Sequence, residues 1–263
     1  MGCSIRKSLF VGVSFMDFKA NDGKKVEIEV NGKVYLRHAI STHFVKPGED
    51  YIEFVRKYVK DLYESGDIIS LSEKVIALCQ NRVIKREDIK IGFWARFLSK
   101  FASKPKIATG FASEAIKMQY VINKVGLLKV LYASIVSGIT KLFGKKGAFY
   151  EIIGQEISSL DCFDGYDYEY YKDIGIESPE NPNKVCNEIK EKLGFNAIIV
   201  DANEMGQLLL GKNDDISLSD DELLGLIRDN PAGNGTEGTP IVLIREKVSD
   251  PLLTNIAAAD VVT

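Results

Sequence analysis

Hydrophobic and polar residues alternate on both sides of Asn31-Gly32, within residues 24–36. Alternation with a period of two is typical of a strand with one buried face, and Asn-Gly is typical of a two-residue hairpin turn. The pattern therefore predicts a β-hairpin over residues 24–36. Residues 37–45 are predicted to form a further extended segment.

Two segments have apolar residues three or four positions apart, which is the spacing of one helix face. Residues 51–63 show this spacing and carry acidic residues at their beginning, and residues 183–193 show it immediately before Gly194. A glycine at this position ends many helices because it readily adopts a left-handed conformation. Both segments are therefore predicted to be amphipathic helices.

Short apolar runs predict strands that are buried on both faces. Such runs occur at residues 68–71, 197–200 and 241–244, and Asp201 directly follows the second of them. Open α/β sheets bind ligands at the carboxyl ends of their strands, so this position favours a chemical role for Asp201. The alternative, that Asp201 only caps a turn, stays open.

Residues 93–146 are basic, rich in Lys, Leu and Ala, and predicted to be helical. The apolar stretch 127–143 is too short for a transmembrane span, and Lys129 and Lys141 interrupt it. A basic amphipathic helix can lie on a membrane surface. A helical lobe that packs on the sheet or on a second subunit explains the pattern as well. We favour the packed lobe, and we expect no membrane partner.

Composition limits the class of protein. The chain has 263 residues, of which 45% are hydrophobic and 27% charged, as in an ordinary globular protein. Its net charge of −3 gives no reason to expect nucleic acid as a partner. The four cysteines form no CxxC pair and there are two histidines, so neither a disulfide framework nor a His-rich zinc site is expected. The absence of a signal peptide pattern agrees with a cytoplasmic location.

Two glycine-rich motifs fail in their context. Residues 233–238 match G-x-G-x-x-G, but a strand follows them where the dinucleotide fingerprint needs a helix. A glycine loop near a phosphate remains as a weaker interpretation, through backbone N–H donors. Residues 138–146 differ from a Walker A loop in spacing, and Lys146 stands where Ser or Thr binds magnesium. The sequence also has no G-x-S-x-G or H-E-x-x-H motif.

Residues 161–171 form an acidic, aromatic segment. Its oxygen ligands suit Mg²⁺, Mn²⁺ or Ca²⁺, although the spacing is not that of an EF-hand. Most loops of this composition are simply solvated.

Several segments occur in a characteristic order: Lys46-Pro47-Gly48-Glu49-Asp50, Gly66-Asp67, Ser72-Glu73-Lys74-Val75-Ile76, Gln80-Asn81-Arg82, Pro179-Glu180-Asn181-Pro182-Asn183 and Ile198-Ile199-Val200-Asp201. The ordered set resembles the coenzyme F-420 gamma-glutamyl ligase family and frames most of residues 37–211. The resemblance implies an α+β fold with mixed sheets, as an intertwined homodimer. We accordingly expect an N-terminal segment (1–23), a ligase-like domain (24–248) that includes the helical basic lobe, and a flexible tail (249–263).

The resemblance also implies an activity, which is GTP-dependent amide bond formation. A carboxylate on the side chain of the deazaflavin cofactor would be activated as an acyl phosphate, and the amine of glutamate would attack it. Divalent metal ions, Mg²⁺ or Mn²⁺, would hold the nucleotide phosphates. We therefore expect a divalent metal, GTP as co-substrate and a small-molecule carboxylate as substrate, although the sequence does not decide between GTP and ATP.

By the same resemblance, Asp201 matches the metal-binding Asp of the family. Lys74 matches the lysine of a Ser-Lys turn, which could contact phosphate or the substrate carboxylate and is our candidate catalytic residue. Glu204 and Asn203 lie near Asp201 in the sequence and are expected to bind metal and ligand, respectively.

Two further candidates come from a more distant segment. Gln155 is set against an asparagine of the family and is expected to orient the nucleotide. Asp161 matches a second metal-binding Asp only with a small insertion, so Asp164 is kept as its alternative.

The chain departs from the family pattern at two of these places. Ala202 follows Asp201 where the family commonly has threonine, and Gln80 stands where it commonly has glutamate. These changes indicate a divergent member whose acceptor need not be the deazaflavin cofactor. They also motivate an alternative function, a non-catalytic nucleotide- or metal-binding regulatory protein that keeps the fold.

Overall fold

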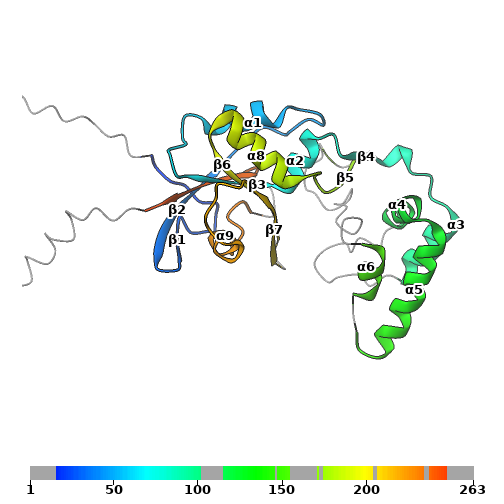
Figure 1. Ribbon diagram of the computed structural model, residues 1–263. Coiled ribbons are helices and arrows are strands. Elements are labelled where there is room, and N and C mark those ends of the chain that lie inside the picture. Colours follow the sequence, from blue (N-terminus) through cyan, green and yellow to red (C-terminus); the bar gives the residue numbers. More distant parts are fainter. Residues whose placement is uncertain are drawn as a thin grey trace, which may run out of the picture.

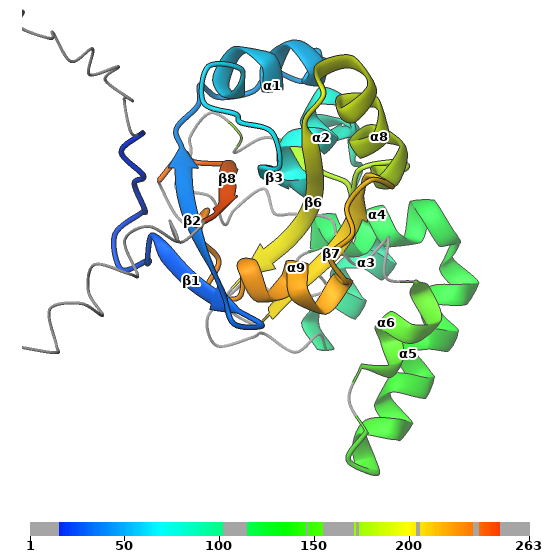
Figure 2. The same cartoon turned by 60° about the vertical axis from the view of Figure 1, so that its left-hand side comes forward.

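A mixed β-sheet with helices on both faces forms the larger part of the structure, and a group of helices stands beside it (Figures 1 and 2). The computed structural model describes residues 16–101, 115–145, 147–154, 171, 174–203, 206–233 and 237–247. The strands of the main sheet are, in spatial order, β1 (Glu27–Val30), β2 (Lys33–Ile40), β8 (Ile241–Glu246), β3 (Ile68–Ser72), β6 (Asn196–Asn203) and β7 (Gly206–Lys212). Strands β3 and β6 are parallel, and the other neighbours are antiparallel.

The hairpin predicted from the alternating pattern is present as β1 and β2. Val30 pairs with Lys33, and Asn31 and Gly32 both have positive φ, of 50° and 77°. Two successive positive φ values are typical of a type I′ turn, whose twist matches that of the two strands. Residues 37–45 were predicted to be a separate extended segment, but residues 37–40 instead continue β2.

Three helices cover one face of the sheet: α1 (Tyr51–Val59), α2 (Glu73–Cys79) and α8 (Pro182–Leu193). The core beneath them includes Ile69, Leu71 and Ile199, which are fully buried. Helix α9 (Asp220–Leu226) covers the opposite face, where Ile198 and Val242 are buried. Burial of such a side chain contributes about 1.5–3 kcal/mol, so the central strands hold the layers together.

Local signals fix the ends of the helices. Asp50 accepts hydrogen bonds from the backbone N–H groups of Ile52 and Glu53, at 2.7 and 3.2 Å, and so caps the N-terminus of α1. Gly194 has a φ of 78° and ends α8, as its position in the sequence predicted. These caps satisfy backbone groups that have no partner inside the helix.

The separate group contains α3 (Phe93–Leu98), α4 (Ala115–Val125), α5 (Leu127–Leu142) and α6 (Ala148–Ile153), which surround an apolar core of their own. In the chain, β4 (Val83–Lys85) and the 3-10 helix Arg86–Asp88 precede this group, and a second 3-10 helix, Ser99–Phe101, follows α3. After the group, β5 (Ile174–Ile176) pairs with β4 in a small antiparallel sheet. In the described part of the chain, no single helix has the length and apolarity of a membrane span. Only α4 and α5 together reach them, and a bend of 118° separates the two.

The structure adds elements that the pattern did not predict. Strand β6 does not stop at Val200 but continues through Asp201 to Asn203. Strand β7 and helix α9 were not predicted, because each is only seven residues long and contains a glycine. The expected α+β architecture with a mixed sheet is confirmed.

Candidate functional site

The carboxyl ends of β3 and β6 lie at the same edge of the sheet. Ser72 is the last residue of β3, and it lies opposite Val200 in the parallel register. Helix α2 begins directly after Ser72 and carries Lys74 in its first turn, while Asp201 directly follows Val200. The fold therefore brings the backbone positions of Lys74 and Asp201, 127 positions apart in the sequence, to one edge.

The side chain of Asp201 also lies on the face of the sheet that helix α2 covers. Side chains alternate between the two faces of a strand. Ile199 lies in the core under α1, α2 and α8, whereas Val200 and Ala202 pack on the side of α9. By this alternation Asp201 projects toward the α2 side, and its side chain is partly exposed, as is that of Lys74.

The glycine-rich segment 233–238 reaches the same edge. The buried side chain of Asn230 donates to the carbonyl of Ala202, at 3.2 Å, and to the carbonyl of Gly233, at 3.1 Å. Beyond the segment, the N–H of Ser72 donates to the carbonyl of Pro240, at 2.9 Å. The described residues on either side of this segment thus lie near the tip of β6, through Gly233, and near the end of β3, through Pro240.

Gly233 lies close to an acidic side chain within this segment. It has a φ of 79°, and a Cβ placed on it would lie 2.4 Å from the carboxyl carbon of Glu237. From the sequence, a role of this segment near a phosphate is only a weaker interpretation, because its motif lacks a helix after it. Its position beside Asp201 depends on contacts between distant parts of the chain and could not be derived from the motif.

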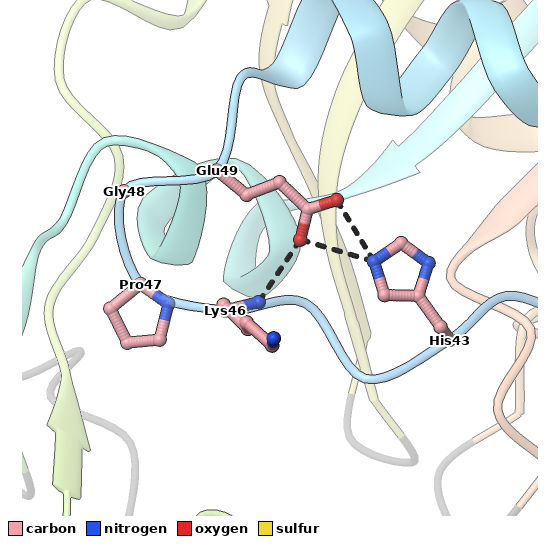
Figure 3. Close-up of a pocket in the computed structure, with 5 residues that line it drawn as sticks. All are labelled: His43, Lys46, Pro47, Gly48 and Glu49. Atoms are coloured by element: carbon pink, nitrogen blue, oxygen red, sulfur yellow. Dashed lines mark hydrogen bonds and ion pairs between the residues drawn. The ribbon is translucent and has the colours of Figure 1, made fainter.

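The loop Lys46-Pro47-Gly48-Glu49 forms a hollow of about 440 Å³ together with His43 (Figure 3). The Nε2 atom of His43 lies 2.9 and 3.1 Å from the carboxylate oxygens of Glu49, and its Nδ1 atom lies 2.6 Å from the hydroxyl of Tyr58. The N–H of Gly48 donates to the carbonyl of Leu78, at 2.9 Å, which attaches the loop to α2.

The charge of Glu49 is stabilised within this hollow. Partial burial acts to raise the pKa of Glu49, but hydrogen bonds from His43 and from the backbone N–H of Lys46 outweigh it and lower the pKa below its usual value. The N–H of Thr42 donates to the carbonyl of Gly238, at 3.0 Å. The hollow is therefore connected to the glycine-rich segment and to the same edge of the sheet.

Gln80, one of the departures from the family pattern, has a clear structural role. Its side-chain amide donates to the carbonyl of Glu180, at 2.9 Å, and accepts from the N–H of Glu180, at 2.7 Å. A carboxylate at this position could accept the second bond but could not donate the first. Arg82 adds a bond from Nε to the carbonyl of Ser178, at 2.7 Å, so both side chains fix the turn that precedes α8.

The structure describes only part of the predicted site. Lys74 and Asp201 are described in full, whereas Asn203 is described through its backbone, which pairs with Gly206. The other candidates, Gln155, Asp161 with its alternative Asp164, and Glu204, lie outside the described residues. Among the residues that the structure does describe, no three side chains of His, Cys, Asp or Glu gather as a metal site.

Fold and site together define an α+β protein in which several loops meet at the carboxyl edge of a mixed sheet. The sequence model of the F420-0:gamma-glutamyl ligase family matches residues 39–204, and the chain belongs to this family. A search of curated proteins found no match. The family match supports a ligase function. The matched range ends at the tip of β6, although β7, α9 and β8 complete the same sheet and its covering layer.

Proposed function

We propose that the protein is a metal- and nucleotide-dependent ligase that joins a small carboxylate acceptor to an amino acid, L-glutamate, through an amide bond. The observation that carries this proposal is the register between Ser72 and Val200. It places a lysine and an aspartate at one sheet edge, beside a glycine-rich segment, and these residue types suit the handling of a metal-bound phosphate.

The reaction has two steps. A carboxylate oxygen of the acceptor attacks the γ-phosphorus of GTP, which gives an acyl phosphate and GDP. The amine of glutamate then attacks the acyl carbon, inorganic phosphate leaves, and the amine loses a proton. Catalysis of such transfers consists mainly of positioning and of charge stabilisation, so it needs no special nucleophile on the protein.

Each candidate residue has a defined role in the proposal. Asp201 holds a divalent metal, Mg²⁺ or Mn²⁺, which would neutralise charge on the phosphates. Lys74 provides a positive point charge for the transferred phosphoryl group or the acceptor carboxylate. Backbone N–H groups of the glycine-rich segment suit the nucleotide phosphates, and Asp161 and Glu204 are proposed as further metal ligands, with Gln155 and Asn203 contacting the nucleotide.

Calorimetric titration with Mn²⁺ tests the metal site. We expect binding by the unaltered protein and none by Asp201→Asn, because the amide removes the charged ligand. Asp61→Asn is the matched control, since Asp61 is exposed and follows α1 near the beginning of β3, at the other edge of the sheet. Unchanged Mn²⁺ affinity in Asp201→Asn would disprove the site assignment.

Phosphate release tests the chemistry. The protein is incubated with GTP or ATP, glutamate and a panel of small carboxylates, and phosphate release should depend on both the acceptor and glutamate. Lys74→Gln should lower kcat while Mn²⁺ affinity is retained. Nucleotide binding without turnover would instead favour the regulatory alternative, which the loss of a hydroxyl at Ala202 and the structural use of Gln80 motivate.

Two broader expectations are kept as proposals. A homodimer rests on the family resemblance alone. A cytoplasmic location is supported by Cys79 and Cys186, which are both buried and free.

A further inference from the structure

Helix α5 exposes a continuous apolar stripe. Its members are spaced by alternating steps of four and three positions, and their exposed fractions range from 51% to 86%: Leu128, Tyr132, Ile135, Ile139 and Leu142. Phe143, directly after the helix, is 85% exposed. Steps of four and three residues keep side chains on one face of a helix, so the stripe forms a single surface.

The opposite face of α5 does the internal packing. Val130 and Ala133 are fully buried in the core that α5 shares with α4 and α6. The exposed stripe is therefore not needed to hold the helical group together. Monomeric soluble proteins rarely expose a contiguous apolar surface of this kind, and those that do commonly use it for binding.

The charges around the stripe indicate which partner fits it. Helix α5 carries Lys129 and Lys141 and contains no Asp or Glu. Residues 93–146 contain ten Lys or Arg and one Glu. A second copy of α5 would bring lysines toward lysines with no acidic side chain on either helix, which is unfavourable. An anionic lipid surface supplies the missing negative charge.

The residue types also suit a membrane surface. Tyr132 lies within the stripe, and tyrosine is enriched at the level of the lipid headgroups. At the end of the helix, Lys145 follows Leu142 and Phe143, and its long side chain can reach the headgroups while the apolar side chains go deeper. Lys145 forms an ion pair with the exposed Glu151, at 3.1 Å. Such an exposed pair contributes little in water, so lipid phosphates can replace Glu151 as its partner.

A second apolar patch lies on α3 and on the 3-10 helix that follows it, in the same group of helices. Phe93, Trp94, Phe97 and Phe101 are 42% to 72% exposed. The rings of Phe93 and Phe97 are stacked, with centroids 6.1 Å apart. Exposed aromatic side chains next to Arg96 and Lys100 have the same combination of apolar and basic character as α5.

The geometry favours a helix that lies on the bilayer. The 16 residues of α5 span about 24 Å at 1.5 Å per residue, which is less than the hydrocarbon core of about 30 Å. Helix α4 cannot extend it in a straight line because the two are bent by 118°. An amphipathic helix of this length can lie in the plane of the interface with its apolar face buried among the lipids.

We propose that α5 docks the protein on an anionic membrane surface, with the stripe at the boundary between headgroups and acyl chains and with Lys129, beside the stripe, and Lys145, after the helix, at the lipid phosphates. This replaces the expectation of a helical lobe that packs on the sheet or on a second subunit and has no membrane partner. It is independent of the proposed ligase chemistry, and a dimer formed through another surface is compatible with it.

Co-sedimentation of the full chain with vesicles tests the proposal. We expect binding to vesicles that contain phosphatidylserine, much weaker binding to pure phosphatidylcholine, and release at high salt. Ile135→Ser combined with Ile139→Ser should reduce the bound fraction by roughly tenfold or more, since the polar replacements remove apolar contact with the lipid. Leu208→Ser is the control, because Leu208 is 53% exposed but lies on β7.

A second variant tests the contribution of the lysine charges to vesicle binding separately from that of the apolar stripe. Lys129→Gln combined with Lys145→Gln leaves the apolar surface intact, and we expect roughly a tenfold loss of binding to phosphatidylserine vesicles. Equal binding to neutral and anionic vesicles, or no binding to either, would overturn the proposal. Sedimentation velocity tests the competing partner, a second copy of the chain. If the protein self-associates but does not bind vesicles, and the Ile135→Ser, Ile139→Ser double variant no longer self-associates, the stripe is a contact between two copies.

Discussion

The hydroxyl of Tyr120 donates a hydrogen bond to the carboxylate of Glu177 across 2.5 Å, and so connects helix α4 to the segment that follows β5. Lys124 on the same helix lies 2.8 Å from this carboxylate, and Arg82 lies 3.2 Å from it on the other side. Glu177 is 10% exposed through its side chain. One largely buried carboxylate therefore joins the helical group to the layer that carries the candidate site.

This junction predicts a pH dependence of stability. Burial acts to raise the pKa of Glu177, but hydrogen bonds from Lys124 and Tyr120 and the charge of Arg82 outweigh it, so the pKa is lowered. A lowered pKa means that the ionised carboxylate stabilises the fold above the usual glutamate pKa, and that this contribution is lost as the pH falls through the lowered value. Unfolding in urea from pH 7 to pH 3 should show the loss.

Glu177→Gln should remove this part of the pH dependence. Near pH 7 we expect a cost of about 1–3 kcal/mol, as for the loss of hydrogen bonds to a charged group. Glu180→Gln is the control, because Glu180 also pairs with Arg82 but is 64% exposed. A pH profile of Glu177→Gln that matches the unaltered protein would contradict the role of this junction.

Arg37 and Asp229 form a second buried connection. Arg37 is 1% exposed, and it contacts Asp229 while donating to the carbonyl of Leu226 at 3.1 Å. Asp229→Ala would leave this guanidinium buried without its carboxylate, so we expect a loss of about 3 kcal/mol in the free energy of unfolding. Asp229 precedes Asn230, which holds the glycine-rich segment at the tip of β6.

The same variant should therefore affect ligand binding as well. If nucleotide binds at the glycine-rich segment, its affinity should fall in Asp229→Ala at a temperature where the variant is still folded. Asp221→Asn, on the exposed side of α9, is a control for a charge change nearby. Unchanged stability in Asp229→Ala would show that the ion pair is not required.

Gly211 allows a close approach between β7 and the beginning of α8. A Cβ at this position would lie 2.6 Å from the backbone nitrogen of Asn183 and from the backbone carbon of Pro182. Backbone cannot move aside cheaply, so Gly211→Ala should cost about 2 kcal/mol or more. At Gly225 in α9 the nearest atoms are methyl groups of Val30, at 3.3 Å, so Gly225→Ala should cost much less. Thermal unfolding of the two variants compares them directly.

The two hydrogen bonds between Gln80 and the backbone of Glu180 predict a graded series. Gln80→Ala removes both bonds and should cost about 1–2 kcal/mol, whereas Gln80→Glu keeps the acceptor and should cost about 1 kcal/mol. Urea unfolding measures both values. If Gln80→Glu were as stable as the unaltered protein and raised turnover, the side chain would belong to the chemistry and not to the turn before α8.

Several elements could be predicted from the sequence because their signals are local. Asn31-Gly32 specifies a tight turn between alternating residues, and Gly194 ends a helix through its own backbone freedom. The sequence placed Asp201 directly after a strand, whereas β6 continues through Asp201 to Asn203. Strand β7 and helix α9 escaped prediction, since seven residues give too little periodicity to distinguish them from a loop.

Within the candidate site, the sequence provided the residue types and the tertiary structure decided which of them meet. The pairing of Ser72 with Val200 brings Lys74 and Asp201 to one edge, and no spacing along the chain contains this information. The insertion of β8 between β2 and β3, and the bonds from Asn230 to Ala202 and Gly233, are likewise contacts between distant segments. Turns and helix ends depend on the conformational preferences of a few neighbouring residues, so the sequence by itself determined them. Strand order and register depend on the burial of side chains from the whole chain at once, so only the folded structure decided them.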